Sequence, residues 1–129
     1  MSKILVIEDN YEIRENLAEF LQLSGHETVA ANCGVLGIQI AKEFEPDLII
    51  CDILMPGMDG YTVFRTLSGS QQGSIPFIFS TSMSEKSDIA EAMSLGAYDF
   101  IVKPYELDDL LIKIENCLNS LQRRQQSIY

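Results

Sequence analysis

The stretch DLIICDI, residues 47–53, leads directly into LMPGMDG, residues 54–60, and together they decide the fold class. The apolar residues run continuously instead of alternating, which is typical of a strand buried on both faces of a parallel sheet. Asp52 stands at the end of this run, just before a proline and two glycines turn the chain. Asp52 therefore either begins a turn or is a reactive carboxylate held at the edge of a sheet.

The rest of the chain repeats the same pattern of a short apolar run followed by a helical segment. The expected strands cover residues 3–7, 27–31, 47–53, 75–81 and 98–102, and the expected helices cover residues 10–25, 34–44, 59–67, 85–96 and 106–126. Five such repeats predict a single α/β domain of the doubly wound (βα)5 type, a five-stranded parallel sheet with helices on both faces. The spacing does not give the order of the strands.

Length and composition exclude several classes of protein. The chain has 129 residues, of which 47% are hydrophobic, and this suits one domain with a substantial core. Its net charge of -10 argues against direct binding of nucleic acid or an anionic membrane, since both need a basic face. Cys33, Cys51 and Cys117 are widely spaced, which argues against a disulfide framework or a zinc site. No apolar stretch approaches the length of a signal or membrane-spanning segment, so we expect a cytoplasmic protein.

Charged or hydroxyl-bearing side chains lie at the carboxyl ends of four of the five expected strands. In parallel α/β sheets, ligands bind beyond the carboxyl ends of the strands. The residues at those ends are Glu8 and Asp9, then Asp52, then Thr81 and Ser82, and finally Lys103 with Pro104. We therefore expect three acids, a hydroxyl and a lysine to converge at one edge of the sheet.

This combination of groups points to phosphoryl transfer. Glu8, Asp9 and Asp52 would repel one another unless a proton or a cation intervenes, and Mg²⁺ prefers such oxygen ligands. Thr81 and Lys103 beside them would cradle a phosphoryl group, with Asp52 as the nucleophile that becomes an acyl phosphate. A pair of acids sharing a proton for hydrolysis is the alternative. The phosphate loop GxxxxGK[ST] is absent from the sequence, so ATP is not the expected donor.

Four segments, in this order and at this spacing, resemble a known family. They are ILVIEDN (4–10), LIICDILMPGMDG (48–60), IPFIFSTS (75–82) and GAYDFIVKP (96–104). The chain resembles the receiver domain of bacterial two-component response regulators, in a form similar to the chemotaxis regulators, over residues 2–122. The resemblance implies a signalling switch, phosphorylated by a sensor histidine kinase or a His-phosphotransfer protein, which regulates an output partner or domain. It implies no enzyme activity beyond the domain's own phosphorylation and dephosphorylation.

The resemblance also assigns roles to individual residues. Asp52 matches the phosphoacceptor. Glu8, Asp9, Asp52 and the backbone carbonyl of Leu54 match the ligands of Mg²⁺ or Mn²⁺. Thr81, Lys103 and Phe100 match the phosphate-binding and switch residues, and the bond between Lys103 and Pro104 matches one that is often cis. Leu54 and Met83 occupy two positions that modulate hydrolysis. Since neither side chain can orient an attacking water, we expect slow self-dephosphorylation.

Two other functions stay open. A phosphatase of the haloacid dehalogenase kind would need a second aspartate two residues after Asp52, where this chain has Leu54. An interaction module that is never phosphorylated would not need the full set of site residues.

The last expected helix carries a leucine-rich stripe that is typical of a helix covering a sheet. Its apolar residues follow a 4-3-4-3 spacing and are Leu107, Leu111, Ile114, Leu118 and Leu121. By the resemblance, residues 1–122 form the receiver domain, and residues 123–129 form a polar C-terminal helical extension or tail. That extension is either the frayed end of a stand-alone receiver or the start of a connection to an output domain. The face formed by the fourth and fifth helices is the expected surface for a homodimer.

Overall fold

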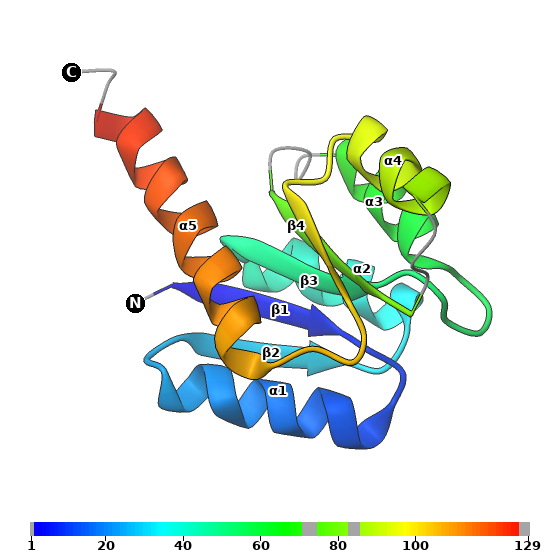
Figure 1. Ribbon diagram of the computed structural model, residues 1–129, viewed down its shortest axis with the longest axis horizontal. Helices are drawn as coiled ribbons and strands as arrows, with labels where there is room; N and C mark the ends of the chain where they lie inside the picture. The colour runs from blue at the N-terminus through cyan, green and yellow to red at the C-terminus, as the bar shows by residue number, and fades with distance from the viewer. Residues whose placement is uncertain (1, 71–74, 83–85, 127–129) are drawn as a thin grey trace.

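The computed structural model describes the backbone of residues 2–70, 75–82 and 86–126, and their side chains except at residues 86–88 and 122–126. Strands and helices alternate along the chain (Figure 1). The strands are β1 (Lys3–Ile7), β2 (Glu27–Ala31), β3 (Leu48–Asp52), β4 (Phe77–Thr81) and β5 (Asp99–Val102). The helices are α1 (Tyr11–Leu23), α2 (Gly34–Phe44), α3 (Gly60–Ser68), α4 (Lys86–Ser94) and α5 (Leu107–Gln126).

The strands form one parallel sheet in the order β2-β1-β3-β4-β5. The chain first moves outward from β1 to β2, and then returns to place β3 on the other side of β1. The order therefore reverses between β1 and β3, and this reversal is where ligands bind in sheets of this type. Glu8 follows β1 and Asp52 ends β3, so both acids lie at this switch point.

Two helices begin at residues whose side chains cap them. The Asn10 Oδ1 accepts a hydrogen bond of 3.0 Å from the backbone N–H of Ile13, at the start of α1. The Asp59 Oδ1 accepts one of 2.8 Å from the backbone N–H of Thr62, at the start of α3. Such caps satisfy N–H groups that have no partner within the helix. They fix where α1 and α3 leave the edge of the sheet that carries Glu8 and Asp52.

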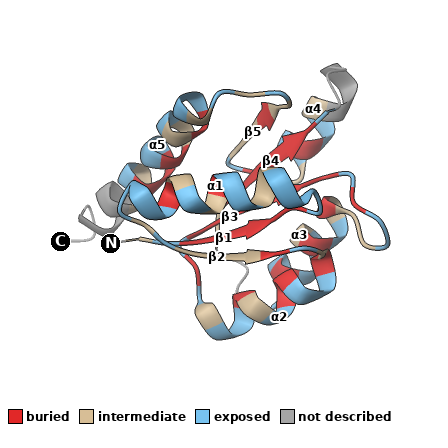
Figure 2. Ribbon diagram, turned by 90° about the horizontal axis from the view of Figure 1, so that it is seen from below, coloured by how far each residue is buried: buried red, intermediate tan, exposed pale blue. Residues whose placement is uncertain are grey.

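The core has two layers, one on each face of the sheet (Figure 2). On one face α1 and α5 pack Leu17, Leu21, Leu110 and Ile114 against the sheet. On the other face α2, α3 and α4 contribute Ile38, Ala41, Val63, Leu67 and Ala92, which pack with Phe77 and Phe79 of β4. All five residues of β3 are buried, as the continuous apolar run predicts. The central strand that ends in Asp52 is thus held from both sides.

The predicted fold class is confirmed, and the differences lie at the ends of elements. The strand expected from residue 75 begins at Phe77, because Pro76 has no N–H to donate to a neighbouring strand. The helix expected from residue 59 begins at Gly60, because Asp59 is its cap. The helix expected to reach Gly96 ends at Ser94, and Gly96 has a φ of 106°, which is outside the helical region.

The leucine-rich stripe of α5 covers the sheet as expected, since Ile114 and Leu118 are buried and Leu107 and Leu111 pack beside them. The backbone of α5 stays helical through Gln126, and its C-terminal part projects past the sheet (Figure 1). Cys33, Cys51 and Cys117 are thiols that take part in no disulfide. Among the described residues, no helix combines the length and the apolar character needed to cross a membrane.

Candidate phosphoacceptor site

Three acidic side chains meet at the carboxyl ends of β1 and β3. Glu8 and Asp52 are only 2% and 5% exposed, whereas Asp9 is exposed. One carboxylate oxygen from each of the three residues lies within 4.8 Å of the others. The predicted convergence of the three acids is therefore present in the structure. Buried carboxylates at this separation need a counter-charge.

Lys103 supplies one positive charge to this cluster. Its Nζ donates to the Glu8 Oε1 at 2.6 Å and to the Asp52 Oδ2 at 3.1 Å. The backbone N–H of Lys103 also donates to the Thr81 carbonyl at 2.7 Å, which ties the ends of β4 and β5 together. The bond from Lys103 to Pro104 is cis, as predicted. One ammonium group cannot neutralise three carboxylates, so the site still favours a further cation.

The ionisation of the site reflects this imbalance. Burial, together with the charge of Glu8, raises the pKa of Asp52 to about 7, although Lys103 opposes the rise. Burial alone would lower the pKa of Lys103, but its hydrogen bond to Glu8 and the charges of Asp52 and Glu8 raise that pKa overall. Lys103 therefore stays charged at neutral pH, whereas Asp52 is only partly ionised until more positive charge is brought near it.

The three acids fit a hard divalent cation. They offer only oxygen ligands, which suits Mg²⁺ or Mn²⁺ better than softer metals. A cation held there would favour the ionised form of Asp52, because an opposite charge at short range lowers the pKa of a carboxyl group. Leu54, whose carbonyl is the further ligand expected from the sequence, lies just beyond β3 and is 55% exposed. Its part in metal binding stays a prediction.

The predicted switch residues Thr81 and Phe100 lie on β4 and β5 and are buried to different degrees. Thr81 ends β4, is 2% exposed, and pairs with Val102 in the register of β4 and β5. Phe100 is half-buried in β5 against the core, and the Lys113 Nζ lies 5.7 Å from the centre of its ring. Met83 lies outside the residues that the structure describes.

Gly60 packs closely against the backbone of Asp52 and Ile53. It is the first residue of α3, and its N–H donates to the Ile53 carbonyl at 2.8 Å. A Cβ atom at this position would meet the carbonyl oxygen of Asp52 and lie 2.9 Å from the Cα of Ile53. The backbone of the α3 N-terminus is therefore in direct contact with the end of β3, and only glycine fits there.

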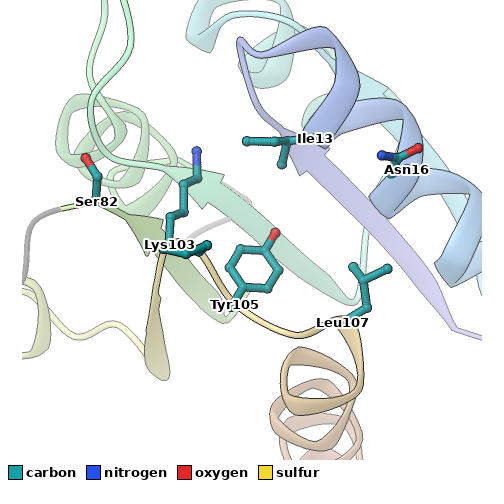
Figure 3. Close-up of a pocket in the computed structure, with 7 residues that line it drawn as sticks. Ile13, Asn16, Ser82, Lys103, Tyr105 and Leu107 are labelled. Atoms are coloured by element: carbon teal, nitrogen blue, oxygen red, sulfur yellow. The ribbon is translucent and has the colours of Figure 1, made fainter.

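A cavity of about 500 Å³ opens beside the site, between α1 and the segment that joins β5 to α5 (Figure 3). Its lining comprises Ile13, Asn16, Ser82, Lys103, Pro104, Tyr105 and Leu107. Figure 3 shows Lys103 and Tyr105 projecting from the chain beyond β5 toward this opening, with Ile13 on its far side. The cavity therefore lies next to Lys103, at the carboxyl edge of the sheet.

Sequence reasoning missed two residues of this region, Tyr105 and Arg14. Burial, with the charges of Glu8 and Asp52, raises the pKa of Tyr105 to about 12, so its hydroxyl group keeps its proton at neutral pH. Its position directly after Pro104 at a strand end was the signal available for it. Arg14, on α1, donates to the backbone of the acidic pair, and no periodicity or motif distinguishes it from the other polar residues of that helix.

Comparison with known proteins agrees with this architecture. The family model described as the response regulator receiver domain matches residues 4–115. The chain is 31% identical over 99% of its length to the regulatory protein AtoC of Escherichia coli, covering 27% of that protein. It is 35% identical over 94% of its length to the probable transcriptional regulator ycf27 of Porphyridium aerugineum, covering 50% of it. The chain thus spans a quarter to a half of these curated relatives.

A solved structure supports the same conclusion. The Vibrio cholerae chemotaxis protein CheY4 superposes with a TM-score of 0.85 at 28% identity, over 91% of this chain and 98% of that one. The fold, the acidic cluster with its lysine, and the match over residues 4–115 all agree. The chain therefore belongs to the family of response regulator receiver domains, the phosphorylation-dependent signalling domains of two-component systems.

Proposed function

We propose that Asp52 accepts a phosphoryl group from a histidine kinase or a His-phosphotransfer protein, in a reaction that needs Mg²⁺ or Mn²⁺. The observation that carries this proposal is a buried carboxylate at the end of the central strand. Asp52 is bonded to Lys103 at 3.1 Å and lies within 4.8 Å of two further acids. The chain's only catalysis would be its own phosphorylation and dephosphorylation, and the protein would act as a switch.

The proposed step is a displacement at phosphorus. A carboxylate oxygen of Asp52 attacks the phosphorus atom of a phosphohistidine, and an O–P bond forms as the P–N bond breaks. The electron pair of the P–N bond stays on the imidazole, which takes up a proton from water. Glu8, Asp9, Asp52 and the Leu54 carbonyl would hold the divalent cation, which supplies positive charge to the phosphoryl oxygens. Lys103 would leave Asp52 for one phosphoryl oxygen, and the Thr81 hydroxyl group would donate to another.

The output of the switch would pass through β4, α4, β5 and α5. Movement of Thr81 toward the phosphoryl group frees space beside β5, and Phe100 would follow inward. Exposed apolar residues on this side of the molecule support its use as a contact surface for a partner or for a homodimer. They are Met93, Tyr98 and Ile112. In this proposal residues 1–122 form the switch, and residues 123–129 form a polar C-terminal extension or tail, of which residues 127–129 lie outside the described part of the chain.

Incubation with acetyl phosphate and Mg²⁺, followed by intact mass measurement, tests the proposal. We expect the mass of one phosphoryl group to be added, and no addition in Asp52→Asn or after chelation of the metal. Asp59→Asn, which alters another acid beyond β3, is the matched control and should be phosphorylated normally. A chain that gains no mass would be an interaction module, and rapid consumption of the donor without a stable adduct would indicate a phosphatase.

The apolar, exposed Leu54 predicts a long-lived phosphoryl group. Leu54→Asn would place a hydrogen-bonding side chain two residues after Asp52, where it could orient an attacking water. We expect it to accelerate dephosphorylation about tenfold, which corresponds to about 1.4 kcal/mol in the activation barrier. Loss of radiolabel from purified phosphorylated protein measures the rate. Leu54→Met, which remains apolar, should decay at the rate of the unaltered chain, and decay within seconds for all three would contradict the prediction.

A further inference from the structure

Arg14 is held against the backbone of the two acidic residues that follow β1. Its Nη1 donates to the carbonyl oxygen of Glu8 at 3.0 Å and approaches that of Asp9 at 3.4 Å. Its guanidinium carbon also lies 5.4 Å from the centre of the Tyr11 ring. One side chain on α1 therefore contacts consecutive peptide groups of the turn that carries two predicted metal ligands.

The other contacts of this turn hold Glu8 more firmly than Asp9. The Glu8 N–H donates to the Ala31 carbonyl at 3.0 Å, and its carboxylate accepts from the Asn10 N–H at 3.1 Å and from the Lys103 Nζ at 2.6 Å. Asp9 is exposed, and within the described parts of the chain its carboxylate receives no hydrogen bond. The position of Asp9 thus depends on its backbone, where Arg14 makes its contact.

The competing explanation, an ordinary surface ion pair, does not account for this geometry. The Arg14 Nε lies 3.8 Å from the Glu15 Oε2, and the Glu15 side chain is 52% exposed, so this pair is weak. The Arg14 side chain is only 14% exposed, and its shortest hydrogen bond is the one to the Glu8 carbonyl. Arg14 is therefore directed at the turn and not at Glu15.

We propose that Arg14 is a positioning residue for the metal site, which fixes the turn at residues 8–9 so that Asp9 points at the cation. This inference rests on the proposed function, since it concerns the same Mg²⁺ site. It predicts a change in Mg²⁺ affinity that is opposite to the change expected from loss of charge alone. Removing a positive charge beside a cation site would by itself tighten Mg²⁺ binding. Loosening a group that orients a ligand weakens binding, typically by one to two orders of magnitude.

The test is the affinity for Mg²⁺ alone, measured by calorimetric titration without any phosphodonor. Arg14→Met keeps the aliphatic stem and the helix propensity but removes the donors, and we expect about tenfold weaker binding. Arg14→Lys, which keeps the charge and can reach one carbonyl, should show a smaller loss. Glu15→Gln, which removes the other partner of Arg14, should bind Mg²⁺ as the unaltered chain does. Unchanged or tighter binding by Arg14→Met would overturn the inference.

A double-mutant cycle with Asp9→Asn tests whether Arg14 acts through Asp9. If it does, Arg14→Met should have little further effect on Mg²⁺ affinity once Asp9 is replaced. If Arg14→Met weakened Mg²⁺ binding equally in the unaltered chain and in Asp9→Asn, Arg14 would not act through Asp9. If Arg14→Met does not fold, Arg14→Lys takes its place in the same double-mutant cycle with Asp9→Asn. If the unaltered chain binds no Mg²⁺, the proposed function and the inference both fail, whereas equal binding by Arg14→Met removes the inference alone.

Discussion

Asp52→Asn should make the metal-free protein more stable at pH 8, by up to about 4 kcal/mol. The upper limit follows from the pKa of Asp52, which burial raises from 3.8 to about 7, since each pKa unit corresponds to about 1.4 kcal/mol. A carboxyl group whose pKa is raised in the folded state costs stability when it is ionised. That cost is absent well below pH 3.8, where Asp52 is protonated in both states, and grows as the pH rises from 3.8 to about 7. Lys103 is charged throughout this range, so it adds no pH dependence to the free energy of unfolding.

Urea unfolding in the presence of a chelator, at a series of pH values from 4 to 8, measures this effect. The difference in unfolding free energy between Asp52→Asn and the unaltered chain should widen as the pH rises. Saturating Mg²⁺ should narrow it, because a cation that binds only the folded state stabilises the unaltered chain. Asp9→Asn, which removes the exposed acid of the same cluster, should gain less stability than Asp52→Asn. A constant difference from pH 4 to pH 8 would show that Asp52 is not destabilising when ionised.

Gly60→Ala should cost about 3 kcal/mol of stability and slow phosphorylation of Asp52. An added Cβ atom would press on the Asp52 carbonyl and on the Cα of Ile53, and backbone cannot yield as a flexible side chain can. Either α3 moves outward or the end of β3 shifts, and the second response displaces the Asp52 carboxylate. Displacement by even a fraction of an ångström lowers the rate of a reaction that depends on positioning.

The matched control is Gly69→Ala, at the other end of α3. Gly69 has a φ of -86°, and an added Cβ atom would lie 3.7 Å from the nearest atom, so the substitution fits. We expect its unfolding free energy to differ from that of the unaltered chain by less than about 1 kcal/mol. Urea midpoints and the initial rate with acetyl phosphate distinguish the two variants. A Gly60→Ala protein with the stability and rate of Gly69→Ala would contradict the packing argument.

The sequence predicts much of this fold because the strong signals are local. The unbroken apolar runs that become β1, β3 and β4 identify buried parallel strands, and acids directly after such runs lie at the strand ends. The strand order was not predictable from spacing, because it depends on which strands pair and not on their separation along the chain. Element ends were displaced where a cap such as Asp59, or the missing N–H of Pro76, decided the boundary.

The candidate site was predictable in its membership and not in its contacts. Glu8, Asp52 and Lys103 follow from their places beyond the strands, but the bridging of both acids by Lys103 depends on how β5 sits beside β4. Arg14 could not be recognised, because its partners are backbone carbonyl groups, which any sequence supplies. The close fit of Gly60 against Asp52 is likewise a consequence of how α3 packs, which a glycine in a turn does not reveal on its own.

The bond from Lys103 to Glu8 joins residues that are 95 positions apart in the chain. The acids at the ends of β1 and β3 emerge early during synthesis, but their lysine arrives only after β5, near the end of this chain. A growing polypeptide therefore carries Asp52, the proposed phosphoacceptor, long before it carries the lysine that would hold a phosphoryl group in place. Competence to receive a signal would thus arise in a single late event, when the last strand pairs with β4.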